Sequence, residues 1–179
     1  LKKNGIDFDV IPSNVDEDPI KRGLITEGAT PELISKNLAE LKANSISQRN
    51  LDEIVLGADS VIDLEGELIS KPLNRIEALE ILNKLNGKTH RLISSVCLSQ
   101  NGNMIWNFSD KSVLTMNKLS EKDLIKYLSK IPDNILYSYN VYQIEGIGRS
   151  LFSSIKGDNN SIMGLPIKQI TTFLKGYRC

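Results

Sequence analysis

The stretch Ile54-Val55-Leu56-Gly57-Ala58-Asp59-Ser60 decides the interpretation of the whole chain. Its first three residues are apolar, and short apolar strands are typically covered by helices on both faces. The strand is predicted to end at Gly57-Ala58-Asp59, which would place the carboxylate of Asp59 at its carboxyl end. Open α/β sheets bind ligands at that edge, and a residue as small as Gly57 lets a ligand approach the backbone. Asp59 is therefore a candidate functional acid, with a turn-capping acid as the alternative.

Four segments around this stretch carry helix signals. Thr30-Pro31 supplies an N-cap and a helix-compatible proline for a helix that runs to about Ser47. The sequence Asn74-Arg75-Ile76-Glu77 is a capping box for a second helix. A third helix is predicted after Ser120 and a fourth after Gly164-Leu165-Pro166. The residues expected to face inward on the last three helices are Ile76, Leu79, Leu82, Leu85, Leu124, Ile125, Leu128, Ile167, Ile170 and Leu174.

Strand and turn signals lie between the helices. Residues 1–5 are typical of a helix end capped by Asn4-Gly5, and Phe8 and Val10 alternate with acids as in a half-buried strand. Residues 15–19 are predicted to be an acidic loop. Two short strands over residues 61–69 turn at Glu65-Gly66, and Asn101-Gly102 marks a hairpin between later strands. This order predicts an α/β fold with a mixed sheet flanked by helices.

The composition excludes several classes of protein. The chain has 179 residues, and its 22 Lys and Arg balance 22 Asp and Glu, which argues against binding to polymeric nucleic acid. The length fits one domain over residues 1–179, or two small lobes that share a core. No apolar run approaches the roughly 20 residues of a membrane span. The two cysteines, Cys97 and Cys179, form no metal-binding motif and fit a cytoplasmic protein with reduced thiols.

Several other polar residues are candidates for a site. Lys71, held by the following proline, could bind phosphate as a point charge, with an ordinary surface lysine as the alternative. Glu17 belongs to an acidic cluster that could hold Mg²⁺ together with Asp59, or could be a solvated loop. Lys42 lies on the polar side of its helix and is expected to face solvent unless another group recruits it. His90, the only histidine, is expected to be structural.

In this order, the segments resemble the Maf family, the septum formation nucleotide pyrophosphatases. The resemblance covers essentially the whole chain. It implies a fold like that of inosine triphosphate pyrophosphatases, with two lobes around a cleft. It also implies a homodimer that hydrolyses a nucleoside triphosphate to the monophosphate and pyrophosphate with a divalent metal, Mg²⁺ or Mn²⁺. The segments that carry it are residues 5–10, 15–17, 41–43, 57–61, 70–72, 85–90, 142–148 and 164–166.

The resemblance also assigns roles to individual residues. Asp59 matches the catalytic acid of the family, and Asp59 and Glu17 are implied to hold the metal. Lys42 and Lys71 match its active-site lysines, which bind the substrate. Two further positions expected to bind substrate depart from the family pattern, since Ser60 replaces Thr and Glu145 replaces Gln. A carboxylate accepts hydrogen bonds but does not donate them, and the base preference stays open between pyrimidine, guanine and methylated guanine.

A third departure concerns the start of the chain. Family members open with a strand and a Ser-x-Ser-Pro-Arg-Arg loop at a helix N-terminus, a ready anion site. The sequence given begins at Leu1, after that point, so it lacks the loop, either because the sequence is truncated or because the lineage lost it. Two hypotheses follow. The first is a metal-dependent pyrophosphatase that removes modified nucleotides, and the second is a catalytically weak or inactive regulator of septum formation.

Overall fold

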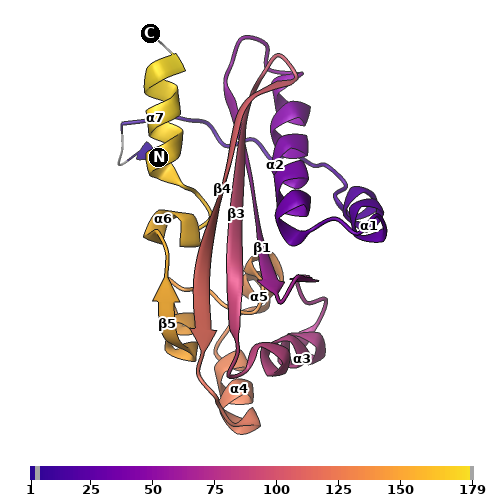
Figure 1. Ribbon diagram of the computed structural model, residues 1–179, viewed down its shortest axis with the longest axis vertical. Coiled ribbons are helices and arrows are strands. Elements are labelled where there is room, and N and C mark those ends of the chain that lie inside the picture. Colours follow the sequence, from indigo (N-terminus) through magenta and orange to yellow (C-terminus); the bar gives the residue numbers. More distant parts are fainter. Residues whose placement is uncertain (3–4, 178–179) are drawn as a thin grey trace. The chain divides into compact units, whose positions relative to one another are not determined.

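The computed structural model describes residues 1–2 and 5–177, except for the side chains of residues 138 and 139 (Figure 1). The chain divides into two compact units. Unit 1 comprises Leu1–Ser60, Ile93–Asp110 and Asp158–Cys179, and unit 2 comprises Val61–Leu92 and Lys111–Gly157. A five-stranded sheet has the order β2-β1-β3-β4-β5. Among the described residues, no helix combines the length and apolar character needed to cross a membrane.

Unit 1 holds the first part of β1, the second part of β3 and the first part of β4. The bounds of these strands are Val55–Leu64, Thr89–Gln100 and Asn103–Met116. Four helices of this unit are α1 (Asp18–Thr26), α2 (Pro31–Ser47), α6 (Asn159–Ile162) and α7 (Ile167–Tyr177). The N-cap of α2 is formed as predicted, because Thr30 Oγ1 accepts a hydrogen bond from the backbone N–H of Leu33 at 3.3 Å.

The strands of unit 1 carry helices on both faces. Cys97 on β3 packs against Ala39 and Ala43 of α2. Ser94, three residues earlier on β3 and so on the other face, donates a hydrogen bond from its hydroxyl to the carbonyl of Ser161 in α6 at 2.7 Å. Because successive side chains of a strand point to opposite faces, α2 covers one face and α6 and α7 the other. Figure 1 shows α2 and α7 on either side of these strands.

The packing of α2 on β1 depends on Gly57. A Cβ atom at this position would lie 2.6 Å from the backbone N of Ala43 and 2.9 Å from its Cβ, and would also collide with the carbonyl oxygen of Ala39. Real Cβ atoms essentially never come closer than 3.0 Å to such neighbours. Only a residue without a side chain therefore lets the helix and the strand approach this closely.

Unit 2 contains the remaining parts of the three long strands and most of the large buried apolar cluster. Its capped helices start as predicted: Asn74 Oδ1 accepts from the N–H of Glu77 at 2.9 Å, and Ser120 Oγ accepts from that of Asp123 at 3.2 Å. Buried Leu82 of α3 and Leu124 of α4 lie in the same cluster. The other elements are β2 (Glu67–Ile69), α3 (Arg75–Leu85), α4 (Glu121–Leu128), α5 (Asp133–Tyr139), the 3₁₀ helix η2 (Ile147–Leu151) and β5 (Phe152–Lys156).

The predicted turns are also present. Glu65 and Gly66, between β1 and β2, have φ values of +56° and +92°, and Asn101 and Gly102, between β3 and β4, have +52° and +79°. Two successive positive φ values are typical of the tight turns that join antiparallel strands. The α/β fold with a sheet flanked by helices is confirmed, but the sheet is antiparallel and not mixed as predicted.

The N-terminal region differs from the prediction. Residues 6–17 form no strand, and Phe8 and Val10 are 41% and 81% exposed. Alternation alone does not make a strand, because a strand needs a hydrogen-bonding neighbour, and no described segment pairs with this one. The predicted acidic loop is also wrong at its end, where α1 begins at Asp18. At Gly5, φ is +74°, as the predicted cap requires, whereas Lys3 and Asn4 lie outside the described residues.

Two predicted inward positions are also wrong. Ile76 is 74% exposed and Ile125 is 50% exposed. The buried stripe of α3 passes instead through Ala78, Leu82 and Leu85, whose spacing of three to four residues leaves Ile76 on another side of the helix. The residues that do point inward keep this spacing. The prediction was therefore correct about the helices, but it assigned one residue too many to the buried face of α3 and one too many to that of α4.

The close approach at Gly57 leads to a prediction about stability. We expect Gly57→Ala to lower the free energy of unfolding by at least about 2 kcal/mol, because the new Cβ would overlap backbone atoms that cannot yield locally. The matched control is Gly23→Ala, in the middle of α1 with no atom within 4 Å of an added Cβ. This change should raise stability by about 0.5 kcal/mol. Urea unfolding of the two variants measures both effects, and equal stabilities would contradict the packing described.

Candidate active site

Asp59 lies within β1 and not beyond its end. The strand runs from Val55 to Leu64, so the predicted strand end at Gly57-Ala58-Asp59 is wrong. The error has a physical reason: Gly57 suggests a break in a strand, but here it makes room for α2. The carboxylate of Asp59 is consequently held by a regular strand, on the face of β1 that α2 covers.

Lys42 joins two carboxylates. Its Nζ atom lies 2.8 Å from Asp59 Oδ1 and 3.1 Å from Glu17 Oε1. Lys42 belongs to α2, Asp59 to β1 and Glu17 to the N-cap position of α1, so three elements of unit 1 meet in this Glu17–Lys42–Asp59 trio. The side chains are 21%, 12% and 35% exposed for Lys42, Asp59 and Glu17. The trio is thus partly buried but open to solvent on the side of Glu17.

The charge of Lys42 is stabilised by its neighbours. Burial lowers the pKa of the Lys42 ammonium, but the attraction of Asp59, a hydrogen bond to it and the weaker effect of Glu17 outweigh burial and raise that pKa above its ordinary value of 10.5. Lys42 is therefore fully protonated at neutral pH. Lys42, which was expected to face solvent, instead points to the neighbouring strand β1, where it contacts Asp59.

The two carboxylates of the trio are of the kind that could hold a hard divalent cation, whereas the ammonium of Lys42 has no free electron pair for a metal. Carboxylate oxygens are the protein ligands that Mg²⁺ takes, usually one or two of them, together with substrate phosphates and water. Within the described part of the chain, no group of three or more His, Cys, Asp and Glu could hold a metal. Asp59 and Glu17 would therefore hold such an ion only in part, and oxygen atoms of a phosphate ligand would complete its coordination.

Ser60 points away from the trio. Its hydroxyl lies 2.9 Å from Ser94 Oγ, on the face of the strand that carries α6. Gly164, just before α7, lies against the same hydroxyl, because an added Cβ there would be 3.5 Å from Ser60 Oγ. The structure therefore separates two residues that are adjacent in the sequence and that were both expected at the substrate site.

Lys71 and Glu145 belong to unit 2. Lys71 is exposed in the segment between β2 and α3, next to the buried Pro72. Glu145 is exposed in the turn that precedes η2. The structure brings Glu17, Lys42 and Asp59 together in unit 1, and the roles of Lys71 and Glu145 in binding substrate stay predictions.

The turn that carries Glu145 is anchored at its start by two tyrosines. Tyr142 Oη lies 2.8 Å from Nε2 of the buried His90, and Tyr127 donates its hydroxyl hydrogen to the carbonyl of Val141 at 3.0 Å. Gly148 closes the turn against the backbone of Gln143, where a Cβ would lie 2.9 Å from the Gln143 N atom. Sequence reasoning included Tyr142 only as part of the segment 142–148, without this contact, and missed Tyr127. The signal that could have identified Tyr127 is its position next to the apolar Leu124 and Leu128 on the buried face of α4.

Replacement of Lys42 is expected to destabilise the protein. Lys42→Met would leave two partly buried carboxylates facing each other, and we expect the free energy of unfolding at pH 7 to fall by about 1–3 kcal/mol. The control is Lys36→Met on the same helix, whose exposed ion pair with Glu32 at 3.6 Å should contribute less than about 0.5 kcal/mol.

The same experiment has a pH dependence. Since the pKa of Lys42 is raised in the folded protein, its stabilising effect is complete below pH 10.5 and is lost as the pH rises above that value. Urea unfolding between pH 7 and 11 should show the difference between the wild type and Lys42→Met narrowing at the alkaline end. A constant difference would indicate that packing of the lysine stem, and not its charge, is responsible.

His90 leads to a prediction at acid pH. Burial lowers the pKa of His90 from 6.5 to about 4, so between these values the unfolded chain binds a proton that the folded protein does not. Stability should therefore fall by about 3 kcal/mol as the pH drops from 6.5 to 4. His90→Gln, which keeps a polar group near Tyr142, should show a flatter pH profile in urea unfolding. Parallel profiles for the two proteins would contradict this assignment.

Comparison with known proteins points to one family. The family model described as Maf-like protein matches residues 1–177. The nucleoside triphosphate pyrophosphatase of Pelagibacter ubique (strain HTCC1062) is 63% identical over 98% of this chain and 90% of its own length. Two more distant relatives are the nucleoside triphosphate pyrophosphatase 1 of Jannaschia sp. (strain CCS1), 36% identical over 98% of this chain and 88% of its own length, and the 7-methyl-GTP pyrophosphatase of Brucella abortus biovar 1 (strain 9-941), 35% identical over 100% and 90%.

The match extends over nearly all the described residues, including the trio and both units. The resemblance drawn from the ordered sequence motifs is therefore confirmed, and the chain belongs to the Maf family.

Proposed function

We propose that this chain hydrolyses nucleoside triphosphates to the nucleoside monophosphate and pyrophosphate. The Glu17–Lys42–Asp59 trio is the observation that carries the proposal, because it puts an ammonium and two carboxylates on adjoining elements. The name of the Pelagibacter relative, at 63% identity, supports the same activity. The names of the relatives also favour an enzyme over a regulator without turnover.

The main task of such a site is to compensate charge. A triphosphate carries about four negative charges, and preorganised cations are the largest contribution to most phosphoryl chemistry. Lys42, held in place by its two carboxylates, would contact phosphate oxygens, and Lys71 would add a second charge. Asp59 and Glu17 would hold a divalent cation, which when bound supplies further positive charge to the phosphates.

Asp59 has a second role in the proposal. Its carboxylate would orient the attacking water and accept a proton from it as the water oxygen bonds to the α-phosphorus. The bond from that phosphorus to the bridging oxygen breaks, and pyrophosphate leaves with the electron pair. The neighbouring ammonium of Lys42, 2.8 Å from Oδ1, stabilises Asp59 as the carboxylate that this step needs.

The substrate base is a finer part of the proposal. Glu145 only accepts hydrogen bonds, so it would favour a base edge rich in donors, such as guanine or a methylated guanine. Relatives named nucleoside triphosphate pyrophosphatase match the chain at up to 63% identity, and relatives named 7-methyl-GTP pyrophosphatase match it at up to 39%. The substrate panel below therefore includes modified as well as ordinary nucleotides, as removal of modified nucleotides would require.

Release of pyrophosphate tests the proposal. We expect the protein to release pyrophosphate from at least one of dTTP, UTP, GTP and 7-methyl-GTP in the presence of Mg²⁺ or Mn²⁺, and chelation of the metal to stop it. Asp59→Asn should lower kcat by about 100-fold or more, because the amide no longer accepts the proton. Asp63→Asn is the control, on the same strand, where the carboxylate accepts from the N–H of Gly66 at 2.7 Å.

Two outcomes would count against the proposal. Equal rates for Asp59→Asn and the wild type would remove Asp59 from the reaction. No release from any nucleotide, by a protein shown to be folded, would favour the alternative of a regulator that kept the fold without turnover.

A further inference from the structure

The face of α2 that lies on β1 carries a row of small side chains. Ser35, Ala39 and Ala43 are each fully buried, with an exposed fraction of 0%. Their spacing of four residues places them on one side of the helix, and Lys42 lies next to Ala43. The two alanines show that apolar side chains of this size are enough for the packing against Gly57. A hydroxyl at position 35 therefore needs an explanation of its own.

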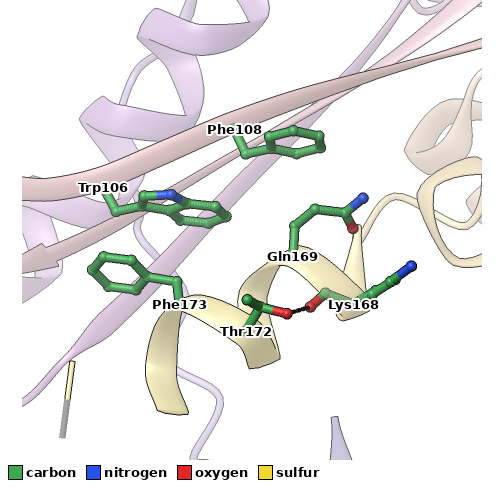
Figure 2. Close-up of a pocket in the computed structure, with 6 residues that line it drawn as sticks. All are labelled: Trp106, Phe108, Lys168, Gln169, Thr172 and Phe173. Carbon is green, nitrogen blue, oxygen red and sulfur yellow. Dashed lines mark hydrogen bonds between the residues drawn. The ribbon is translucent and has the colours of Figure 1, made fainter. Parts of the chain in front are cut away.

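The hydroxyl of Ser35 bonds to the strand and not to its own helix. Ser35 Oγ donates to the main-chain carbonyl oxygen of Asp59 at 3.1 Å. Serine and threonine in a helix commonly donate to a carbonyl of the preceding turn instead. Ser47 of α2 does so, and Thr172 of α7 donates to the carbonyl of Lys168 at 2.9 Å (Figure 2). The Ser35 bond, in contrast, joins residues 24 positions apart.

Asp59 is held by α2 at two points. Ser35 Oγ binds its main-chain carbonyl, and Lys42 Nζ binds its carboxylate Oδ1 at 2.8 Å. Lys42 Nζ also lies 3.5 Å from the carbonyl oxygen of Ala58. Ser35 and Lys42 are separated by about two turns of one helix. A rigid helix therefore fixes both the main chain and the carboxylate of one residue on the strand.

The Ser35 bond contributes direction more than stability. A buried hydroxyl loses its hydrogen bonds to water, and one hydrogen bond within the protein does little more than offset that loss. Alanine at this position would avoid the loss and would also favour the helix. The serine is therefore better explained by the place that it gives the Asp59 carbonyl than by a gain in stability.

We propose that Ser35 is a positioning residue for Asp59. Its bond to the carbonyl fixes the peptide that follows Asp59, so that the carboxylate is aimed at Lys42 and at the water that it would activate. Ser35 itself would touch no substrate, because its side chain is fully buried. The effect on catalysis rests on the proposed function, whereas the alignment of Asp59 with Lys42 does not.

Coupling between Ser35 and Lys42 tests this alignment without any measurement of activity. Lys42→Met is made in the wild type and in Ser35→Ala, and the shifts of the urea midpoint are compared. We expect Lys42→Met to cause only about half the shift in the Ser35→Ala background, because the effects of coupled neighbours do not add. The same titrations show that each variant folds.

The matched control is Ser47→Ala. Ser47 is also a fully buried serine of α2, but its hydroxyl accepts from the N–H of Gly102 at 3.0 Å, in the turn between β3 and β4. Lys42→Met should cause the same shift in this background as in the wild type. Both serine variants remove a buried hydroxyl from one helix, so a difference between them isolates the bond to Asp59.

Kinetics test the effect on catalysis. Ser35→Ala should lower kcat for release of pyrophosphate about tenfold, because a small misplacement of the base slows proton transfer. KM should change by less than about twofold, since the charges that would bind phosphate stay in place. Ser47→Ala should keep both constants. A merely structural role of Ser35 would lower the urea midpoint without this loss of kcat.

Three results would overturn the proposal. The first is an equal shift for Lys42→Met in the wild type and in Ser35→Ala. The second is an equally reduced shift in Ser47→Ala, which would indicate a general loosening of α2. The third, in an active protein, is an unchanged kcat for Ser35→Ala. If no nucleotide releases pyrophosphate, the proposed function fails, and the comparison of midpoints alone decides whether Ser35 aligns Asp59 with Lys42.

Discussion

The contact between Gly57 and α2 is the constraint on which the site depends. With no side chain between them, the helix lies directly on the strand, and Ala39 and Ala43 fill the contact with their small side chains. Lys42 is next to Ala43 on the helix, and Asp59 is two residues beyond Gly57 on the strand. The distance of 2.8 Å between their charged atoms is therefore a consequence of backbone packing, not of two flexible side chains meeting by chance.

The position of the trio explains why its three charges stabilise one another. Lys42 is only 21% exposed, and its raised pKa shows that the attraction of Asp59 and Glu17 more than offsets burial. In a partly buried site, charges interact more strongly than in water. A lysine held between two acids in such a place keeps both its charge and its position, whereas isolated surface charges would be screened.

Signals between residues close in the sequence predicted most helices and turns. Contacts between residues far apart in the sequence were not predicted. Caps such as Thr30 and turns such as Asn101-Gly102 depend on residues within four positions, and both are present in the structure. The place of Asp59 inside β1 and the recruitment of Lys42 depend on packing across 17 residues of sequence. The buried His90–Tyr142 contact joins residues 52 positions apart, and no pattern in the sequence indicates it. The family resemblance identified candidate residues, but their contacts came only from the fold.

The alternation of side chains along the strands gives unit 1 two chemically different faces. Asp59 points to α2, and its neighbour Ser60 points to Ser94 and the opposite face. A single residue of offset therefore separates the charged face, where Lys42 reaches the strand, from the face that carries Trp106 and α7.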